Sequence, residues 1–503
     1  MSAAMSFAAG LSLADLAREL GRVHATVSGD PSVRITDVRQ DSRRVVPGDL
    51  FVARDGLRLN GAHFAAEAVR VGAVALLAER RDATLPDLGV PVVRVDGVRF
   101  ALGLAAEAVH GHPTEALGLV GITGTNGKTT TAWLAEQLID AAGGAAARLG
   151  TLGYAFRDDV VEDSLTTPEA DDVSRFAARA LGRGATHFVM EVSSHALVQR
   201  RVDALAFRVG AFTNLTQDHL DFHGSMDAYG EAKARLFTDL VQRAAVVNVD
   251  DPFGKALAAR APGRVLRVGR DPSCDVRPID VRVDRDGLHG RVALPSGEWP
   301  LASRLVGEHN LDNVLLVLGI VEALDLDVAT AVLALRTATA APGRLERVDE
   351  PGDDVTVLVD YAHTPDALAR VLQASRRLTV GKLHCVFGCG GDRDPTKRPL
   401  MGDAVGAAAD RATLTSDNPR TEAPEAIAAA VEPALASRRI PYDVVLDRAT
   451  AIERAVLDAA PGDLVLIAGK GHEPYQIIGT EKRPFDDRDE ARRALAFRRG
   501  GRP

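Results

Sequence analysis

Short runs of apolar residues alternate along this chain with longer stretches in which apolar residues recur at helical spacing. Runs of about four to eight apolar residues are typical of buried strands, and a period of about 3.6 residues is typical of amphipathic helices. In the central third, helical patterns at 129–142 and 173–181 lie between predicted strands at 117–122, 187–192, 209–213 and 244–249. This alternation predicts an α/β fold whose mainly parallel sheet has helices on both faces.

Two proline-containing segments divide the chain. Pro113 follows a His-Gly-His stretch, and Ala341-Pro342-Gly343 precedes a second α/β alternation. We therefore predict three domains, over residues 1–112, 113–341 and 342–503. Strands are also predicted in the first domain at 33–38, 50–53, 73–78 and 92–95, and in the third at 355–360, 383–388, 412–415 and 464–468. Short runs at 281–283, 289–292 and 299–301 indicate a small antiparallel insert.

Composition and charge mainly exclude other classes of protein. A net charge of −9 argues against sequence-independent binding to nucleic acid or to an anionic membrane. The apolar run at 315–321 is too short to span a bilayer. Near the N-terminus, Ser12 followed by Asp15 predicts the start of a helix instead of a signal peptide. We expect a cytoplasmic monomer with no nucleic-acid partner and no membrane insertion.

Lysine is scarce in this sequence, and cysteine is scarcer. Of 60 basic residues only seven are lysine, so a lysine within a motif hints at chemistry that a guanidinium cannot perform. The three cysteines have neither disulfide nor zinc spacing. We interpret Cys385 and Cys389, which lie in an apolar, glycine-rich stretch, as small buried residues.

The strongest chemical signal is a glycine-rich turn between an apolar run and a helical pattern. Glycines let backbone N–H groups approach phosphate, and the start of the following helix adds partial positive charge. Lys128 is expected to reach the β- and γ-phosphates of a nucleotide, and Thr129 to bind Mg²⁺. Ile122 stands where a standard phosphate loop has its first glycine. The predicted loop residues are Thr123, Gly124, Thr125, Asn126, Gly127, Lys128, Thr129 and Thr130.

The Gly-Thr-Asn-Gly-Lys-Thr form of this loop resembles the Mur ligase family and its relatives, the folylpolyglutamate synthetases. The resemblance implies an enzyme that activates a carboxylate with ATP as an acyl phosphate, which an amine then attacks. Glu191, in Glu-Val-Ser-Ser-His, matches a second Mg²⁺ ligand, and His219 matches a residue that assists this metal. Lys233 matches a lysine that family members carry in carbamylated form. The implied catalytic set is Lys128, Glu191, His219 and Lys233.

Later motifs resemble the family's remaining nucleotide contacts and its amino-acid pocket. Asn313 matches an adenine contact, Arg344 a phosphate contact and Asp360 a ribose contact. The segment Asp417-Asn418-Pro419-Arg420 matches the motif that distinguishes diaminopimelate-adding members from lysine-adding ones. An arginine guanidinium can donate two parallel hydrogen bonds to one carboxylate, and diaminopimelate carries a carboxylate that lysine lacks. Arg393, Gly469 and Glu473 match further positions of this pocket.

The first domain resembles the part of family members that binds a UDP-linked substrate. Gln40, Ser42 and the segment 56–61 match this region. Thr166, Thr167, Ser193, Gln199 and Arg201 match positions around the muramyl peptide and its diphosphate. The resemblance therefore implies UDP-MurNAc-L-Ala-D-Glu, 2,6-diaminopimelate and ATP as substrates, with Mg²⁺ as cofactor.

Three other functions stay open at this point. The lysine-adding ligase is the nearest, and Arg420 argues against it. A folylpolyglutamate synthetase leaves the first domain and Arg420 unexplained. A non-catalytic nucleotide-binding scaffold would have no use for Lys128, Glu191 and Lys233 together.

Overall fold

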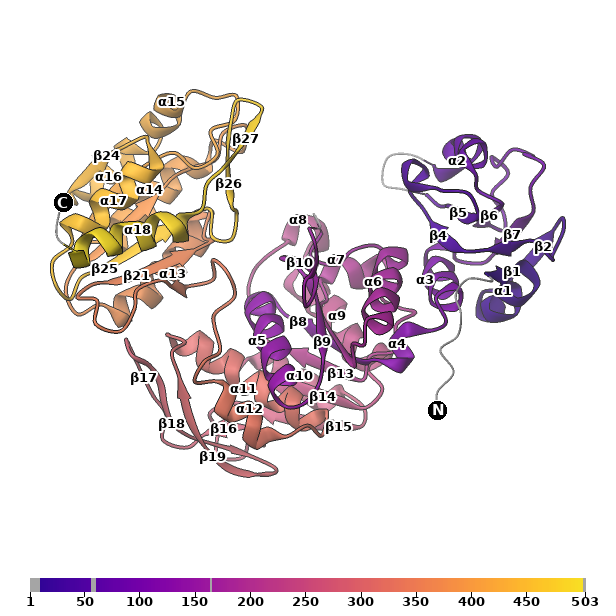
Figure 1. Ribbon diagram of the computed structural model, residues 1–503, viewed down its shortest axis with the longest axis horizontal. Coiled ribbons are helices and arrows are strands. Elements are labelled where there is room, and N and C mark those ends of the chain that lie inside the picture. The colour runs from indigo at the N-terminus through magenta and orange to yellow at the C-terminus, as the bar shows by residue number, and fades with distance from the viewer. Residues whose placement is uncertain (1–9, 56–59, 163–164, 501–503) are drawn as a thin grey trace. The chain divides into compact units, whose positions relative to one another are not determined.

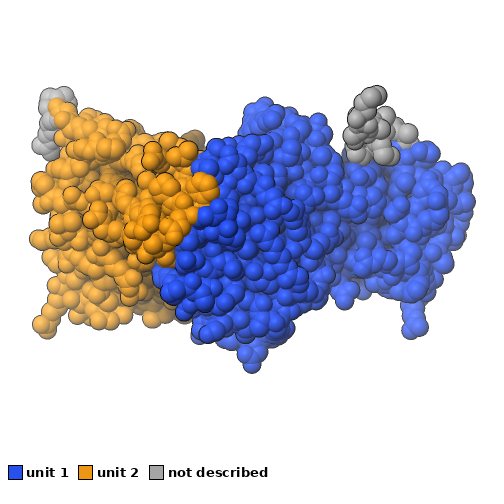
Figure 2. Space-filling model, turned by 90° about the horizontal axis from the view of Figure 1, so that it is seen from below, with its two compact units in different colours: residues 1–277, 293–297, 315–331 blue, residues 278–292, 298–314, 332–503 orange. Residues whose placement is uncertain are grey.

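The structure is a computed structural model that describes residues 10–55, 60–162 and 165–500 (Figure 1). The chain divides into two compact units, which Figure 2 distinguishes by colour. The first comprises residues 1–277, 293–297 and 315–331, and the second comprises residues 278–292, 298–314 and 332–503. The first unit contains two separate large sheets, and the predicted domain boundaries near residues 112 and 341 stay predictions.

A five-stranded sheet occupies the N-terminal part of the first unit. Its order is β2 (Thr26–Ser28), β7 (Val92–Val95), β6 (Ala75–Glu79), β5 (Asp49–Ala53) and β4 (Asp37–Arg39). All neighbours pair in parallel except β2 with β7. Helices α1 (Leu13–Glu19), α2 (Ala65–Val71) and α3 (Val98–Val109) accompany it. Ser12 accepts a hydrogen bond from Asp15 N, which confirms the predicted helix start.

An eight-stranded sheet forms the rest of the first unit's core. Its order is β11 (Asp159–Val161), β10 (Gly153–Phe156), β9 (Ala146–Gly150), β12 (His187–Glu191), β8 (Gly118–Thr123), β13 (Val209–Phe212), β14 (Ala244–Asn248) and β15 (Arg264–Val268). The six strands from β9 to β15 are parallel, and β10 and β11 add an antiparallel edge. The accompanying helices are α4 (Pro113–Ala116), α5 (Lys128–Ala141), α6 (Ala170–Gly182), α7 (Ser194–Val198), α8 (Leu220–His223), α9 (Met226–Arg235) and α10 (Pro252–Arg260). The prediction of a mainly parallel sheet is confirmed.

A small four-stranded sheet follows, where the antiparallel insert was predicted. It contains β16 (Arg277–Pro278), β17 (Arg282–Asp284), β18 (Gly287–Leu294) and β19 (Gly297–Ser303), and β17 pairs antiparallel with β18. Helices α11 (Glu308–Ala323) and α12 (Val328–Ala334) come next in the chain.

The C-terminal part is a six-stranded sheet with helices on both faces. Its order is β20 (Glu346–Arg347), β21 (Thr356–Asp360), β25 (Leu464–Ala468), β22 (Leu383–Phe387), β23 (Arg411–Leu414) and β24 (Tyr442–Val444), parallel from β21 onward. Its helices are α13 (Pro365–Leu378), α14 (Lys397–Ala408), α15 (Pro424–Ala429), α16 (Glu432–Arg438), α17 (Arg448–Asp458) and α18 (Asp487–Gly500). A hairpin of β26 (Tyr475–Ile478) and β27 (Glu481–Pro484) precedes α18.

Successive residues of these strands enter two different cores. Leu358 and Leu466 pack in one hydrophobic cluster, while Val359 and Val465 pack in another. Cys385 and Cys389 are buried in the first of these clusters, as predicted, and Cys274 is also buried and free. Within the described ranges, no helix combines the length and apolar character needed to cross a membrane.

Candidate functional site

The glycine-rich turn connects β8 to α5, as predicted, and a second loop braces it. Gly124 has φ +146°, and a Cβ added there would lie 1.8 Å from Thr213 Oγ1, so only glycine fits. Thr125 N donates to Asn214 O at 2.8 Å. Lys128 Nζ donates to the carbonyls of Gly124 at 3.0 Å and Thr125 at 2.9 Å. An ammonium group and the N-terminus of α5 therefore meet at one turn, an arrangement that suits a phosphate.

Glu191 stands beside this turn because β12 pairs directly with β8. The carboxylate is 2% exposed and accepts a hydrogen bond from Thr129 Oγ1 at 3.0 Å. It also accepts from Thr151 N at 2.8 Å. A hydroxyl and a carboxylate at this separation form an oxygen donor pair of the kind that Mg²⁺ prefers, so Thr129 and Glu191 fit the predicted metal. Within the described residues, no three His, Cys, Asp or Glu side chains are grouped to hold a metal ion.

Lys233 is a buried lysine on α9. Its side chain is 1% exposed, and Nζ donates to Gly124 O at 2.7 Å while lying 4.3 Å from the centre of the Tyr229 ring. Burial lowers the pKa of Lys233 well below its usual value, and the charge of Lys128 lowers it further. The amine is therefore held against the phosphate-loop backbone in an environment that favours its neutral, nucleophilic form.

His219 lies in the loop after β13, and its side chain makes a polar contact with the neighbouring residue Asp218. It adopts a left-handed backbone conformation, φ 51°, at the start of α8. Its Nε2 lies 3.5 Å from Asp218 Oδ2, and its ring meets the His195 ring edge-on at 4.8 Å between centroids. Its role at a metal stays a prediction.

The residues predicted to surround the muramyl peptide form a connected group. Thr167 Oγ1 donates to Glu191 O at 2.9 Å and accepts from Ser193 N at 2.9 Å. Arg201 donates to Thr167 O at 2.8 Å and to Gln199 Oε1 at 2.6 Å. Thr166 immediately precedes Thr167, and its hydroxyl lies 3.2 Å from that of Thr151. The structure thus brings these five predicted residues together next to Glu191.

Gln40 and Ser42 follow β4, and Gln40 extends this group into the N-terminal sheet. Its Nε2 donates to Asp171 Oδ1 at 3.1 Å, and its Oε1 accepts from Arg54. Glu169, which the sequence analysis did not single out, lies 3.1 Å from both Arg54 and Arg201. Ser42 begins a short 3-10 helix, and residues 56–59 of the segment 56–61 lie outside the described residues.

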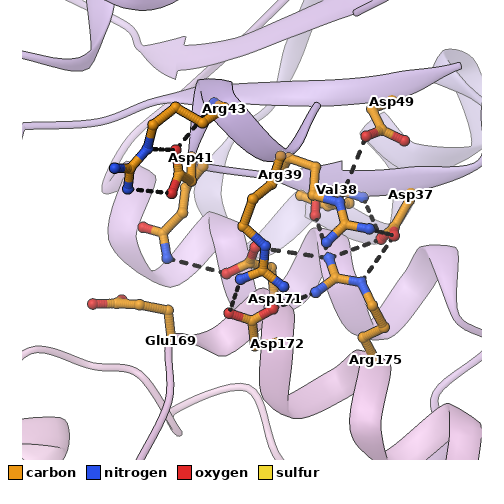
Figure 3. Close-up of polar contacts among 12 residues, drawn as sticks. Asp37, Val38, Arg39, Asp41, Arg43, Asp49, Glu169, Asp171, Asp172 and Arg175 are labelled. Atoms are coloured by element: carbon orange, nitrogen blue, oxygen red, sulfur yellow. Dashed lines mark hydrogen bonds and ion pairs between the residues drawn. The ribbon is translucent and has the colours of Figure 1, made fainter. Parts of the chain in front are cut away.

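An ionic cluster joins β4 to the first two turns of α6 (Figure 3). Arg175 lies 2.9 Å from Asp37 and 2.5 Å from Asp172. Asp171, which is 3% exposed, lies 3.8 Å from the same guanidinium. Burial, and after it the neighbouring charge of Asp172, raise the pKa of Asp171 to about 6. Burial alone would also raise the pKa of Asp37, but its contacts with His110 and Arg175 outweigh that effect and lower it.

Replacing Asp171 with asparagine is expected to change how stability depends on pH. Because the pKa of Asp171 rises from 3.8 to about 6 on folding, the folded state binds this proton more tightly. The contribution of Asp171 to the stability of the wild-type protein must therefore fall as pH rises through this interval and stay lower above it. An asparagine side chain cannot ionise, so Asp171→Asn should gain stability relative to wild type between about pH 4 and pH 6, by at most roughly 3 kcal/mol.

Thermal unfolding at about pH 5 and about pH 8 measures this effect. The matched control is Asp172→Asn, which removes a carboxylate 2.9 Å from Arg44 and 2.5 Å from Arg175 and should lower stability instead. A difference between Asp171→Asn and wild type that is the same at both pH values would contradict the prediction.

The residues predicted to contact the adenine, a phosphate and the ribose of the nucleotide lie in the second unit. Asn313 is buried on α11 and donates to Asn310 Oδ1 at 3.2 Å. Asp360, at the end of β21, accepts hydrogen bonds from Leu345 N at 2.7 Å and from a second backbone N–H. The Arg344 guanidinium lies 5.1 Å from the Tyr361 ring centre. The Asp360 carboxylate thus holds two backbone N–H groups in this structure. The roles of Asn313, Arg344 and Asp360 as nucleotide contacts stay predictions.

A cavity of about 420 Å³ opens at the carboxyl ends of β22, β23 and β25. Six of the seven residues predicted for an amino-acid pocket line it, namely Arg393, Asp417, Asn418, Arg420, Gly469 and Glu473. The seventh, Pro419, lies between two of them, and its carbonyl approaches Gly391. Tyr361, Lys397 and Arg398 also line the cavity, although the sequence motifs did not identify them. The pocket therefore offers arginine, carboxylate and amide groups within one small volume.

Comparison with known proteins gives matches along nearly the whole chain. Residues 34–110 match the family model "Mur ligase family, catalytic domain", residues 122–321 match "Mur ligase middle domain", and residues 343–471 match "Mur ligase, glutamate ligase domain".

Two curated relatives and one solved structure carry the same enzyme name, UDP-N-acetylmuramoyl-L-alanyl-D-glutamate–2,6-diaminopimelate ligase. The relative from Synechococcus elongatus is 45% identical over 477 residues, covering 92% of this chain and 94% of that protein. The relative from Synechocystis is 46% identical over 471 residues, covering 92% and 93%. The solved structure is 32% identical with a TM-score of 0.72, covering 97% and 99%.

Proposed function

This chain belongs to the Mur ligase family, and we propose that it is the member that joins 2,6-diaminopimelate to UDP-MurNAc-L-Ala-D-Glu at the expense of ATP, in peptidoglycan synthesis. The observation that carries the choice of amino acid is the 420 Å³ pocket, where Arg393 and Arg420 share a cavity with Asp417 and Glu473. Diaminopimelate carries two ammonium groups and two carboxylates. A pocket with both cationic and anionic side chains matches such a molecule, and Arg420 suits the carboxylate that lysine lacks.

In the proposed reaction, an oxygen of the D-glutamate carboxylate attacks the γ-phosphorus of ATP, and the bond to ADP breaks. The amine of diaminopimelate then attacks the acyl phosphate carbon, the bond to phosphate breaks, and the amine loses its proton. Lys128 and the N–H groups at the start of α5 stabilise the negative charge that develops on the phosphoryl group. When bound to Thr129 and Glu191, Mg²⁺ supplies further charge neutralisation.

We propose that Lys233 completes this site in carbamylated form. Carbamate formation requires a neutral amine, which attacks CO₂ and releases a proton. The lowered pKa of Lys233 and its burial beside Gly124 favour this reaction. The product is a carboxylate-like group, which places a negative charge near Lys128 and suits Mg²⁺.

A second cavity is the proposed place for the UDP part of the substrate. It measures about 500 Å³ and is lined by residues that follow β5 and β6 and by the start of α3. Arg81, Arg99 and Arg200 line it together with the acidic residues Asp55, Glu79 and Asp82. The three guanidinium groups are the proposed contacts of the diphosphate.

Release of phosphate from ATP by the purified protein tests the proposal. Release is expected only when UDP-MurNAc-L-Ala-D-Glu and diaminopimelate are both present. Release with lysine as the better acceptor would identify the lysine-adding ligase instead. No release with any acceptor, alongside measurable ATP binding, would favour a non-catalytic scaffold.

A further inference from the structure

Lys470 is a completely buried lysine directly beneath the amino-acid pocket. It follows β25 and Gly469, and its side chain is 0% exposed. Its Nζ lies 3.0 Å from Asn418 Oδ1, 3.5 Å from Glu473 Oε2 and 3.6 Å from Asp417 Oδ1. Burying an ammonium group costs free energy unless nearby groups compensate its charge. The three oxygens around Lys470 Nζ supply this compensation.

This lysine fixes the orientation of the Asn418 amide. Asn418 Oδ1 accepts from Lys470 Nζ and also from Ile477 N at 2.9 Å. Asn418 Nδ2 donates to Glu473 Oε2 at 2.9 Å. A rotated amide would place its NH₂ group against two donors and its oxygen against a carboxylate. The Asn418 N–H groups are therefore held toward Glu473 and the cavity.

The same lysine balances charge in the pocket. Asp417 and Glu473 both line the cavity, and Asp417 Oδ1 is buried with no hydrogen-bond donor among the described residues. The Lys470 ammonium at 3.6 Å supplies its nearest positive charge on this loop. Without it, two carboxylates would face an incoming amino acid that itself carries carboxylate groups, and close like charges repel strongly in a buried site.

A separate ion pair supports the ends of β23 and β25, next to Lys470. Arg448 and Asp487 are both fully buried and form two hydrogen bonds of 2.7 Å. Arg448 also donates to Ala468 O at 3.1 Å and to Ser416 O at 3.4 Å, the carbonyls that precede Gly469 and Asp417. The two strand ends therefore have a support that does not depend on Lys470.

We propose that Lys470 is a positioning residue for the amino-acid substrate, which orients the Asn418 amide and compensates Asp417 and Glu473 without itself lining the cavity. This inference rests on the proposed function, since it assumes that the 420 Å³ pocket takes the amino acid. It concerns how the pocket is held in a binding-competent form, whichever diamino acid enters.

Steady-state kinetics of Lys470→Met, which keeps a similar length and removes the charge, tests the proposal. The KM for diaminopimelate should rise about 30-fold, as expected for a charged hydrogen bond, while the KM for ATP changes less than about twofold. Lys470→Gln should show a smaller rise, because its amide still donates to Asn418 Oδ1. In the double variant with Asn418→Ala, the rise should be much smaller than the product of the single effects, because both changes act through one amide.

Lys482→Met is the matched control, because Lys482 is exposed in the adjoining hairpin and lies over the same Tyr475 ring as Lys470. It should leave both KM values unchanged. An unchanged KM for the amino acid in Lys470→Met, an equal rise in the KM for ATP, or multiplicative effects with Asn418→Ala would each overturn the proposal. If Lys470→Met does not fold, Lys470→Gln and Asn418→Ala decide in the same way.

The proposed function fails independently of this inference. If the wild-type protein uses lysine and not diaminopimelate, the assignment of the amino acid is wrong. The same variants, measured with lysine, then still decide whether Lys470 positions the pocket.

Discussion

Lys233→Arg is expected to abolish amide-bond formation while leaving the protein folded. Arginine stays charged at any relevant pH, so it can neither form a carbamate nor offer an oxygen to Mg²⁺. A permanent cation would also remain close to Lys128, whose charge already lowers the pKa of Lys233. Losing several kcal/mol of charge stabilisation predicts a fall in kcat of about a thousandfold. Phosphate release with saturating substrates measures it.

Lys255→Arg is the control for this substitution, since Lys255 is exposed on α10. It should keep the wild-type rate. In Lys233→Ala, short carboxylates such as formate should restore part of the activity by supplying the missing oxygens. Intact-protein mass should show one added CO₂ on the wild-type chain and none on Lys233→Arg. A Lys233→Arg enzyme with wild-type turnover would disprove the carbamate.

Most of the strands that the sequence predicted contain consecutive large apolar residues. Examples are Phe188, Val189 and Met190 in β12 and Val246 and Val247 in β14. The strand β9 is also buried but was missed, because its sequence Ala-Ala-Arg-Leu-Gly has low strand propensity and only one large apolar residue, Leu149. Arg148 is tolerated there because it pairs with Glu136 at 2.7 Å and lies over the Trp133 ring. Such a partner is invisible to a local pattern.

The predicted strand 33–38 shows a second limit of local patterns. The structure divides it into β3 (Arg34–Ile35), which pairs with β1 (Leu11–Ser12), and β4, which pairs with β5. Between them, Thr36 N donates to Gly48 O at 2.9 Å. Apolar character predicted that the segment is extended, but the change of partner depends on segments elsewhere in the chain.

The candidate site shows the same division between local and distant information. Motifs that are contiguous in sequence, such as the turn before Lys128 and the segment from Asp417 to Arg420, could be located directly. The groups that hold them in place come from far along the chain: Lys470 is 52 residues from Asn418, and Glu169 is 32 residues from Arg201. Family resemblance suggests which residues contact substrates, whereas the supporting contacts became visible only in three dimensions.

Arg420→Ala is expected to weaken diaminopimelate binding strongly and to leave ATP binding unchanged. The side chain lines the pocket, and its Nη1 donates to Gly391 O at 2.7 Å. The backbone is fixed on both sides, because Arg420 N donates to Ile477 O at 3.1 Å and Arg420 O accepts from Gly479 N at 2.7 Å. A guanidinium in this rigid setting is ready for a carboxylate. The substitution removes the proposed bidentate, charge-assisted hydrogen bonds between the guanidinium and a carboxylate of diaminopimelate. The KM for diaminopimelate should therefore rise about a hundredfold.

The comparison with lysine separates a specific contact from general damage to the pocket. Because lysine lacks the second carboxylate, its kcat/KM should change little in Arg420→Ala, so the preference for diaminopimelate over lysine should shrink by nearly the full factor. Arg439→Ala is the matched control: Arg439 is an exposed arginine of the same domain with a similar left-handed backbone, φ 57° against 51° for Arg420. It reproduces any backbone effect of the substitution without touching the pocket. A parallel loss of activity with both acceptors, or an equal rise in the KM for ATP, would mean that Arg420 supports the fold of the pocket and does not read the carboxylate.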